Sequence, residues 1–206
     1  MRICTEAGGS MYQVRIHGRG GQGVVSATEM LSVAAFVGGR HAQAFPSFGS
    51  ERTGAPVVAF CRIADTPIRT REPIVAPDAL IIQDPTLLHQ VDVFSGLQRD
   101  GTILINSARS LEALGIGEFA AGFRAERVLT VPATELALDH VGRPLPNAAL
   151  LGAFAALGGP ILLADVVAAI EARFSGALAR GNINAATAAH RFVLQQQRQP
   201  AEAADA

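Results

Sequence analysis

Three glycines and an arginine near the start of the chain have the spacing of a phosphate-binding turn. The stretch reads Gly18, Arg19, Gly20, Gly21, Gln22 and Gly23. Gly18, Gly20 and Gly23 satisfy the G-x-G-x-x-G pattern of dinucleotide-binding loops. Glycine tolerates positive φ in a tight turn, and without a Cβ it lets phosphate oxygens approach the backbone. Arg19 adds a fork of donors suited to phosphate, so the stretch predicts an anion-binding loop.

The segments on either side of this loop position it. The alternating apolar residues Tyr12, Val14 and Ile16 predict a strand, and residues 24–37 predict a buried helix. A strand, a glycine turn and a helix together aim backbone N–H groups and a helix N-terminus at an anion. The alternative is a glycine turn that only lets the helix pack tightly on the strand.

A nicotinamide site would need one more residue, which the sequence lacks. Such sites carry an Asp or Glu at the end of the second strand, about 20 residues after the glycines. Residues 38–44 contain no carboxylate, Glu29 comes too early and Glu51 lies beyond Pro46. The loop therefore has the features of a phosphate cradle without the ribose clamp of an NAD site.

A second candidate segment lies between Phe45 and Pro56. It contains hydroxyls, an acid, a base and two glycines, and long ordered loops tend to be functional. Its candidate binding residues are Ser47, Glu51, Arg52 and Gly54. The alternative is a solvated connection with one surface ion pair between Glu51 and Arg52, which would contribute little to stability.

Composition restricts the class of protein. The 206 residues suit one domain, and the 49% apolar share leaves an excess that a subunit interface would bury. A net charge of −1 without a basic block argues against nucleic acid. No apolar run is long enough to span a bilayer, and residues 1–10 lack the apolar core of a signal peptide. We therefore expect a cytoplasmic protein without a membrane partner.

The chain lacks the residues of a complete active site. Cys4 and Cys61 are too few to hold an iron–sulfur cluster alone, and the histidines lack the spacing of zinc ligands. There is no lysine, which excludes a P-loop and Schiff-base chemistry. His17 is a lone candidate base before the glycine loop, and a lone His at a strand end is more often structural. We expect a binding subunit with no catalytic residue and no metal site.

The order of elements predicts an α/β fold with a doubly wound, mostly parallel sheet. The first βα unit is Rossmann-like, and alternating strands and helices follow it. Further strands are expected at 41–44, 57–63, 79–83, 102–106 and 127–131, with a hairpin strand at 68–71 and helices at 85–97, 134–141, 147–157, 161–174 and 182–196. The last four helices form a helical finish. Residues 12–196 are expected to form a single domain, with 1–11 and 197–206 as flexible termini.

Taken together, three segments resemble a known family. They are the glycine loop at 18–24, a second segment in two parts at 42–46 and 49–56, and a third segment, the run Asn147-Ala148-Ala149-Leu150-Leu151-Gly152. In order and spacing they are similar to the gamma subunit of the 2-oxoacid:acceptor oxidoreductases, of the pyruvate:ferredoxin oxidoreductase type. The resemblance covers about residues 12–196. One departure is Arg52-Thr53-Gly54, where the family often has Arg-Gly-Gly or Arg-Arg-Gly, and this puts a contact by Thr53 in question.

The resemblance implies an activity shared between several chains. The complex decarboxylates a 2-oxoacid on thiamine diphosphate with magnesium, passes electrons through [4Fe-4S] clusters and transfers the acyl group to coenzyme A. Those cofactors belong to partner alpha, beta and delta subunits, and the acceptor is ferredoxin, or NAD through a further FAD-containing subunit. This chain would help to bind coenzyme A, through 19–23 first and 47–54 second.

The sequence leaves some alternatives open. Pyruvate is the commonest substrate in such a family, but an aryl 2-oxoacid such as phenylglyoxylate, indolepyruvate, a branched-chain 2-oxoacid or 2-oxoglutarate would be handled by related assemblies. A stand-alone oxidoreductase that binds NAD or a flavin is a second hypothesis. A purely structural subunit, whose glycine loop only packs against neighbours, is a third.

Overall fold

The central element of the fold is a sheet of six strands. A computed structural model describes residues 11–47 and 53–204. Across the sheet the strand order is β2-β3-β1-β4-β5-β6. The strands are β1 (Tyr12–Arg19), β2 (His41–Pro46), β3 (Pro56–Ala64), β4 (Ala79–Ile82), β5 (Thr102–Asn106) and β6 (Val128–Val131). Glu51 and Arg52 lie outside the described residues.

Most of the sheet is parallel, as the sequence predicts. β1 pairs parallel with β4, and β4, β5 and β6 continue in the same direction. β3 runs antiparallel to both of its neighbours, β1 and β2. The first crossover, from β1 through a helix to β2, therefore leaves room for one strand, and β3 returns along β2 to fill it.

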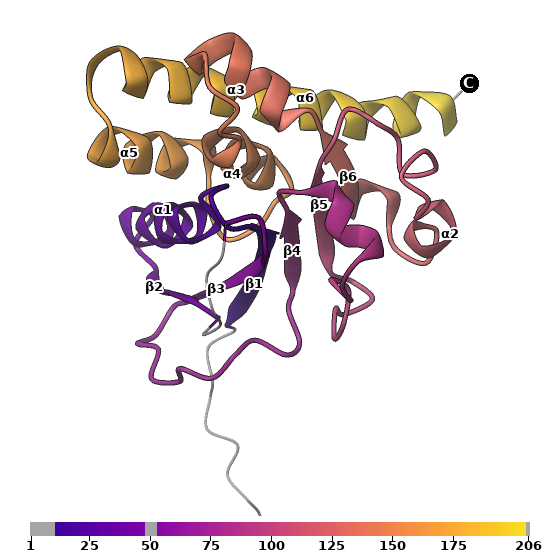
Figure 1. Cartoon of the computed structure of the whole chain (residues 1–206), viewed down its shortest axis with the longest axis horizontal. Coiled ribbons are helices and arrows are strands. Elements are labelled where there is room, and N and C mark those ends of the chain that lie inside the picture. Colours follow the sequence, from indigo (N-terminus) through magenta and orange to yellow (C-terminus); the bar gives the residue numbers. More distant parts are fainter. Residues whose placement is uncertain (1–10, 48–52, 205–206) are drawn as a thin grey trace, which may run out of the picture.

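Long helices cover one face of this sheet and short ones cover the other. The helices are α1 (Val24–Val37), α2 (Gly117–Ala120), α3 (Ala133–Val141), α4 (Asn147–Ala156), α5 (Leu163–Arg173) and α6 (Gly176–Ala204), with 3-10 turns η1 (Pro85–His89) and η2 (Ala125–Arg127). The helices α1, α3, α4, α5 and α6 gather on one side of the sheet (Figure 1). The predicted α/β fold with a helical finish is confirmed, and α1 has the predicted bounds.

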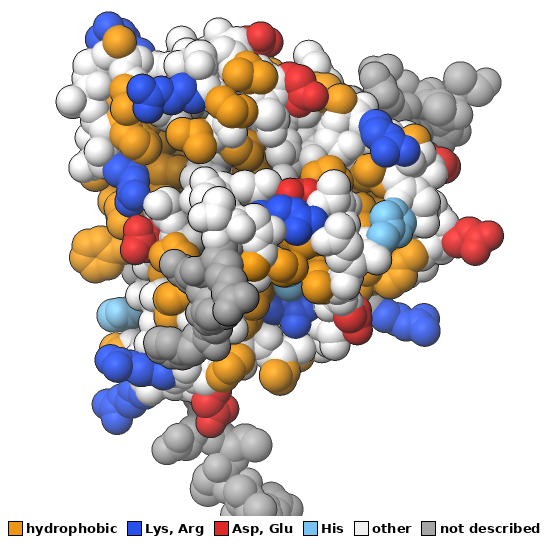
Figure 2. Space-filling view, viewed as in Figure 1, with side chains coloured by type: hydrophobic (Ala, Val, Ile, Leu, Met, Phe, Trp, Pro, Cys, Tyr) orange, Lys and Arg blue, Asp and Glu red, His pale blue; other side chains and the backbone are white. Residues whose placement is uncertain are grey.

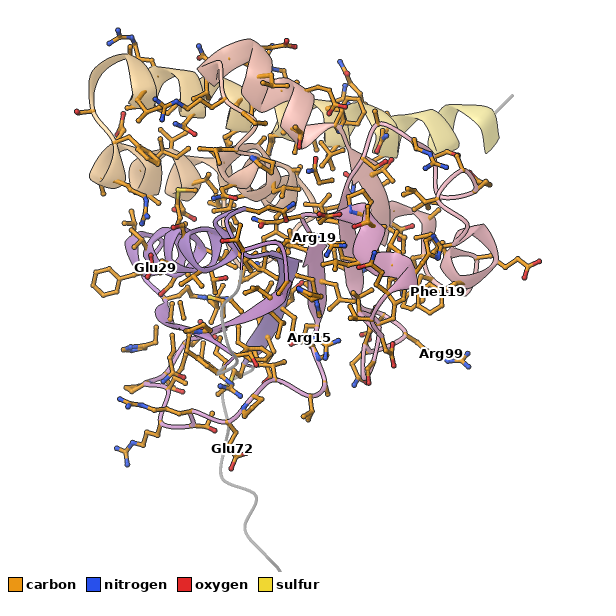
Figure 3. The ribbon with its side chains drawn as sticks, in the orientation of Figure 1. Arg15, Arg19, Glu29, Glu72, Arg99 and Phe119 are labelled. Atoms are coloured by element: carbon orange, nitrogen blue, oxygen red, sulfur yellow. The ribbon has the colours of Figure 1, made fainter. Side chains whose placement is uncertain are left out.

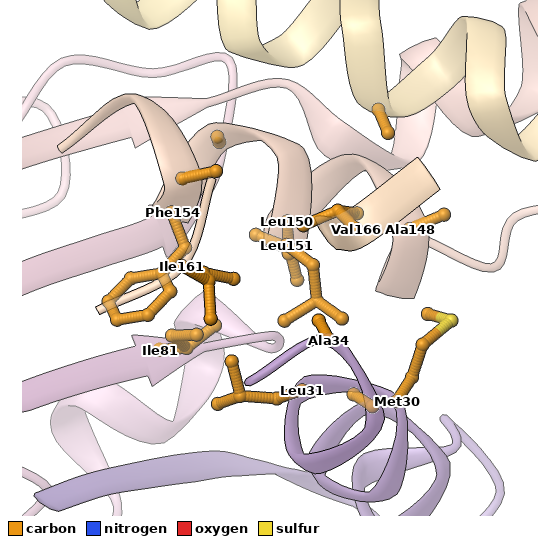
Figure 4. Packing of buried hydrophobic residues seen from close by; sticks show 14 of the residues in the cluster. Met30, Leu31, Ala34, Ile81, Ala148, Leu150, Leu151, Phe154, Ile161 and Val166 are labelled. Atoms are coloured by element: carbon orange, nitrogen blue, oxygen red, sulfur yellow. The ribbon is translucent and has the colours of Figure 1, made fainter. Parts of the chain in front are cut away.

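The main core lies between the sheet and α1, α4 and α5. Along β1, Val14 and Ile16 face this helical layer and are fully buried. Leu31 of α1, together with Leu151 and Phe154 of α4, fills the layer above them (Figure 4). Burying one such side chain contributes about 1.5–3 kcal/mol to stability, so the cluster fixes α1 and its preceding loop on the sheet.

Two glycines let α6 approach its neighbours. A Cβ on Gly152 of α4 would lie 2.1 Å from the Ala186 carbonyl oxygen, and one on Gly181 of α6 would lie 2.6 Å from the His140 carbonyl oxygen. No other residue fits such distances without moving a backbone. Gly152 belongs to the third family segment, and its role is therefore close packing of α4 on α6.

The second face of the sheet is covered by η1, α2 and irregular segments. Ile82, Ile103 and Ile105 form a smaller cluster there with Leu87 and Val93. The helix predicted at 85–97 was wrong beyond its first turn, because only η1 forms. The carbonyl oxygens of Val93 and Ser95 instead accept hydrogen bonds of 2.9 and 2.6 Å from Arg15, which is 8% exposed. A buried guanidinium needs acceptors, and a helix continuing to 97 would have used the Val93 carbonyl itself.

Two other sequence predictions also differ from the structure. Residues 68–71 form no strand; they belong to the segment that crosses the second face, where the Glu72 carbonyl oxygen accepts a hydrogen bond from Arg62. The last helix begins at Gly176 instead of 182, and Asn182 lies inside it, where its Nδ2 donates to the Leu178 carbonyl. Because α6 runs to Ala204, the segment expected as a flexible tail from 197 begins inside this helix.

Candidate functional site

The glycine loop connects β1 to α1 in a conformation that needs glycine. Gly21 has φ 93° and Gly23 has φ 74°, values that side chains rarely adopt. A Cβ on Gly18 would lie 2.6 Å from Val24 Cγ2, so this glycine allows the helix to start close to the strand. The amides of Gly21, Gly23 and Val24 donate to no acceptor within the described part of the chain. They can therefore receive an external anion.

The end of the second candidate segment is joined to this loop. The Gly20 amide donates to the Ala55 carbonyl at 2.9 Å, and the Gly54 amide donates to the Gly20 carbonyl at 3.0 Å. Gly20 also forms an isolated parallel bridge with Thr53. The two segments that the sequence predicts as a site are thus brought together at Gly20 and Gly54.

Arg19 is held by the protein itself. Its Nε forms an ion pair of 3.0 Å with Asp84, and its Nη1 donates to the Gly54 carbonyl at 3.0 Å. Its Nη2 donates to Thr86 Oγ1 at 2.6 Å and to Gln90 Oε1 at 2.7 Å. Arg19 lies at the end of β1, above Arg15 of the same strand (Figure 3). All three guanidinium nitrogens are therefore engaged, and the side chain ties the loop to η1.

Asp84 is the residue that this arrangement depends on, and sequence reasoning missed it. Its Oδ2 also accepts 2.8 Å from Gln22 Nε2, while Gln22 Oε1 accepts 2.7 Å from the Arg19 amide. Burial alone would raise the pKa of the Asp84 carboxyl, but hydrogen bonds from Thr86 and Gln22 and the Arg19 charge bring that pKa below its usual range. The only sequence signal was an Asp-Pro pair after an apolar strand, which indicates a turn.

A chain of amide side chains connects the loop to the third family segment. Asn147 Nδ2 donates to the Gly23 carbonyl at 3.2 Å, and Asn147 Oδ1 accepts 2.8 Å from Gln83 Nε2. The Gln83 carbonyl in turn accepts 2.9 Å from Asn106 Nδ2, which also donates to Thr134 Oγ1 at 2.8 Å. Gly23, Gln83, Asn106 and Thr134 follow or end the strands β1, β4, β5 and β6, at the edge where ligands bind in open α/β sheets, and Asn147 joins them from the start of α4.

Two cavities open beside the glycine loop. One, of about 260 Å³, is lined by the loop, the first turn of α1 and Val57. The other, also of about 260 Å³, lies between the loop, the first half of α1, the segment after α3, the end of α5 and α6. Gly21, Gly23 and Ser26 line both. The loop therefore forms a ridge whose two sides are accessible.

The remaining candidate residues are placed differently. The Ser47 amide, just after β2, donates to the Val58 carbonyl at 2.9 Å, and no described hydrogen bond links Ser47 to the glycine loop. Glu51 and Arg52, outside the described residues, remain predictions. Burial, together with the Arg15 charge, lowers the pKa of His17 to about 4. This side chain is buried, so we infer a structural role for it.

The described residues offer no metal site and no reactive thiol. No group of three or more His, Cys, Asp or Glu side chains with the geometry to hold a metal occurs in residues 11–47 and 53–204. Burial raises the pKa of the Cys61 thiol to about 12, so it stays protonated at neutral pH. None of the helices within those ranges is long and apolar enough to cross a membrane.

Comparison with known proteins identifies the family. Residues 13–192 match the family described as pyruvate ferredoxin/flavodoxin oxidoreductase. The chain belongs to this family. The pyruvate synthase subunit PorC of Methanosarcina barkeri is 51% identical over 79% of this chain and 86% of its own. The pyruvate/ketoisovalerate oxidoreductases common subunit gamma of Pyrococcus abyssi is 43% identical over 85% of this chain and 94% of its own.

Solved structures agree with this assignment. The pyruvate oxidoreductase subunit PORC of Thermotoga maritima has a TM-score of 0.74 and 33% identity, covering 88% of this chain and 96% of that one. The 2-oxoglutarate:ferredoxin oxidoreductase of Magnetococcus marinus, solved with 2-oxoglutarate, coenzyme A and succinyl-CoA bound, has a TM-score of 0.69 and 15% identity. It matches 90% of this chain over 31% of its own and shows the shared fold alone. The protein is a gamma subunit of a multi-subunit oxidoreductase.

Proposed function

We propose that this gamma subunit serves a complex that oxidises a 2-oxoacid, first of all pyruvate, to acyl-CoA, and that it supplies part of the coenzyme A site. Thiamine diphosphate, magnesium and [4Fe-4S] clusters are assigned to partner alpha, beta and delta subunits, with ferredoxin as acceptor. The family and the names of the relatives support pyruvate and ferredoxin. Coenzyme A supplies the thiol that accepts the acyl group.

The 2-oxoacid is selected outside this chain. A relative that is 43% identical is named as the common gamma subunit of pyruvate and ketoisovalerate oxidoreductases. A subunit shared by two substrates cannot be the part that distinguishes them. The same logic leaves an aryl substrate such as phenylglyoxylate within the scope of the proposal, because the side chain of the 2-oxoacid would contact other subunits.

The main support for this proposal is the geometry of the glycine loop. The amides of Gly21, Gly23 and Val24, which have no acceptor among the described residues, open on a cavity at the N-terminus of the 14-residue helix α1. We assign the pyrophosphate of coenzyme A to this position, because backbone N–H groups and the helix dipole both favour a negative charge there. Arg19 and Gln22 hold the loop in shape, so the amides need no rearrangement to bind.

The neighbouring segment completes the site in this proposal. Gly54 is hydrogen-bonded to Gly20 and Thr53 forms a bridge with it, so the described end of this segment lies at the rim of the loop. Arg52 is proposed to offer its charge to a phosphate, with Ser47 and Glu51 as further contacts on the same segment. None of these residues is assigned a bond-making step, and the chain contributes binding and orientation only.

The experiment that tests the proposal changes Gly21 in the assembled complex. Gly21→Glu places a negative charge beside the three loop amides, where a Cβ meets no atom within 4 Å. We expect the KM for coenzyme A to rise at least tenfold, while decarboxylation to the enzyme-bound intermediate survives. Gly39→Glu is the matched control, because Gly39 also has positive φ, at 82°, and an open Cβ position, but lies beyond the other end of α1.

A structural role for the loop is the second candidate, because Arg19 is bonded within the chain on all three nitrogens. In that case Gly21→Glu would reduce recovery of the complex and leave the KM for coenzyme A unchanged. Co-purification from cell extract addresses the hypothesis of a stand-alone NAD or flavin enzyme, which a chain recovered alone would favour. Partner subunits with thiamine diphosphate and iron–sulfur clusters would support the complex, and a flavin subunit would indicate NAD as acceptor.

A further inference from the structure

The cavity on the α5 and α6 side of the glycine loop has two arginines in its wall. Arg143, just after α3, lines it, and its guanidinium makes no hydrogen bond or ion pair with any described residue. Arg173 at the end of α5 lines it too, and its Nη1 lies 3.5 Å from Glu29 Oε2. Arg173 Nη2 donates 3.2 Å to Ser26 Oγ. The charge of Arg173 is thus partly balanced, whereas the charge of Arg143 is available.

The rest of the wall is mostly apolar. Met30, Val141, Leu145, Phe174 and Leu178 line the cavity. Leu145 and Leu178 are 44% and 42% exposed and line the cavity together with the two arginines. On this side of the molecule, hydrophobic atoms lie between Arg side chains over α5 and α6, at the upper left of Figure 2. An apolar wall with a few convergent charges is typical of a ligand pocket.

Size and charge restrict what part of a ligand fits. A volume of about 260 Å³ is below the usual range for a whole drug-sized ligand, so the cavity suits one end of a long molecule. The arginines favour an anionic end, and the apolar side chains favour a flat ring. Gly21 and Gly23, at the edge of the cavity, already belong to the proposed pyrophosphate site.

We propose that this cavity binds the 3′-phosphorylated adenosine of coenzyme A, and that Arg143 recognises the 3′-phosphate. The inference rests on the proposed function, since it takes the pyrophosphate on the glycine loop as its starting point. The adenosine then extends over the ridge of the loop into the cavity, and its base lies against the apolar wall. Arg143 is a binding residue here, and it takes no part in acyl transfer.

The test compares coenzyme A with dephospho-coenzyme A, which lacks only the 3′-phosphate. Equilibrium dissociation constants are measured by calorimetry on the purified complex, and KM values are measured alongside. We expect the wild-type complex to bind coenzyme A at least tenfold tighter. Arg143→Ala weakens coenzyme A about tenfold or more and leaves dephospho-coenzyme A within twofold, since a charge-assisted hydrogen bond is lost from one ligand only.

Further variants distinguish the loss of the Arg143 charge from an unspecific effect of the substitution on the fold. Arg143→Lys should keep part of the preference, because it retains the charge but loses the fork. Arg173→Ala should have a smaller effect, because Glu29 already opposes its charge. Arg180→Ala is the matched control: this exposed arginine of α6 does not line the cavity and should leave both constants unchanged. Adenosine 3′,5′-bisphosphate should compete with coenzyme A against the wild type and lose this ability against Arg143→Ala.

Two results would overturn the inference. One is a wild-type complex that binds both ligands equally, and the other is an Arg143→Ala variant that weakens both equally or neither. The Gly21→Glu variant separates this failure from that of the proposed function. If Gly21→Glu raises the KM for coenzyme A and Arg143→Ala leaves the preference intact, only the cavity assignment fails. If Gly21→Glu also has no effect, the coenzyme A site itself is elsewhere.

Discussion

Gln83 and Asn147, 64 positions apart in the sequence, are joined by a hydrogen bond of 2.8 Å from Gln83 Nε2 to Asn147 Oδ1. Gln83 is 3% exposed and follows β4, while Asn147 begins α4. Because Asn147 also donates to the Gly23 carbonyl, this pair connects the end of β4 to the glycine loop and fixes their relative position. The third family segment is therefore a support for the first.

Removing the Asn147 side chain should destabilise the protein. Asn147→Ala leaves the buried Gln83 amide without its acceptor, which costs about 1–3 kcal/mol. Urea unfolding of the purified chain measures this change. Asn184→Ala, on the exposed face of α6, is the control and should stay within about 0.5 kcal/mol of the wild type. Equal losses in both variants would show that the Gln83–Asn147 bond contributes nothing specific.

The Arg19–Asp84 pair should be more strongly coupled than an ordinary surface pair. Its side chains are 21% and 13% exposed and share further bonds with Gln22 and Thr86. A double-mutant cycle with alanine should give a coupling of about 1–3 kcal/mol. The exposed Arg40–Asp65 pair, 2.8 Å apart and 33% and 61% exposed, should give less than about 1 kcal/mol. Similar couplings for both pairs would contradict the bracing role of Arg19.

Alanine at two helical glycines should destabilise, against the usual trend. Gly→Ala inside a helix normally stabilises by about 0.5–1 kcal/mol. Here Gly181→Ala would press on the His140 carbonyl and Gly152→Ala on the Ala186 carbonyl, with the latter contact closer. We expect losses of about 1–3 kcal/mol, larger at Gly152. Gln195→Ala, exposed on α6, serves as control in thermal unfolding. A raised Tm in either glycine variant would refute the close packing.

His17 should make the fold sensitive to acid. Its folded pKa of about 4 lies below the ordinary value of 6.5, so between these values the unfolded chain binds a proton that the folded chain does not. Stability should therefore fall as pH drops from about 6.5 to 4, by up to about 1.4 kcal/mol per pH unit, and be unaffected by His17 above this window. Burial also lowers the pKa of His190, which adds to the same trend.

A His17→Gln variant isolates this contribution. Urea unfolding at a series of pH values should show a shallower decline between pH 6.5 and 4 than the wild type shows. A variant whose decline is as steep as that of the wild type would mean that other groups, His190 among them, account for the acid sensitivity.

The sequence predicted the elements better than their connections. Residues 24–37 were predicted correctly because the surrounding glycines and the long apolar run act locally. The insertion of β3 between β1 and β2 was not predicted, since strand order depends on pairing between distant segments. The start of the last helix at Gly176 instead of 182 was not predicted either, because the close contact of Gly181 with the His140 carbonyl depends on the packing of α6 against α3.

In the candidate site, too, local features were predicted and contacts between distant residues were not. The glycine loop was predicted from the spacing of its glycines, because a backbone with positive φ requires glycine at fixed positions. Asp84 was missed, because its bonds to Arg19 and Gln22 come from residues 65 and 62 positions away. Arg143 was missed as well, since a lone arginine in a loop between helices gives no pattern. Its place beside the glycine loop follows only from the packing of α3, α5 and α6.

Hydrogen–deuterium exchange of the purified complex, with and without coenzyme A, tests most directly whether this subunit binds coenzyme A at its glycine loop. We predict slower exchange in peptides covering residues 20–26 when coenzyme A is added, because the amides of Gly21, Gly23 and Val24 would donate to phosphate. Peptides covering residues 33–40, at the other end of α1, should exchange unchanged. Protection confined to other subunits, with no change at residues 20–26, would contradict the account.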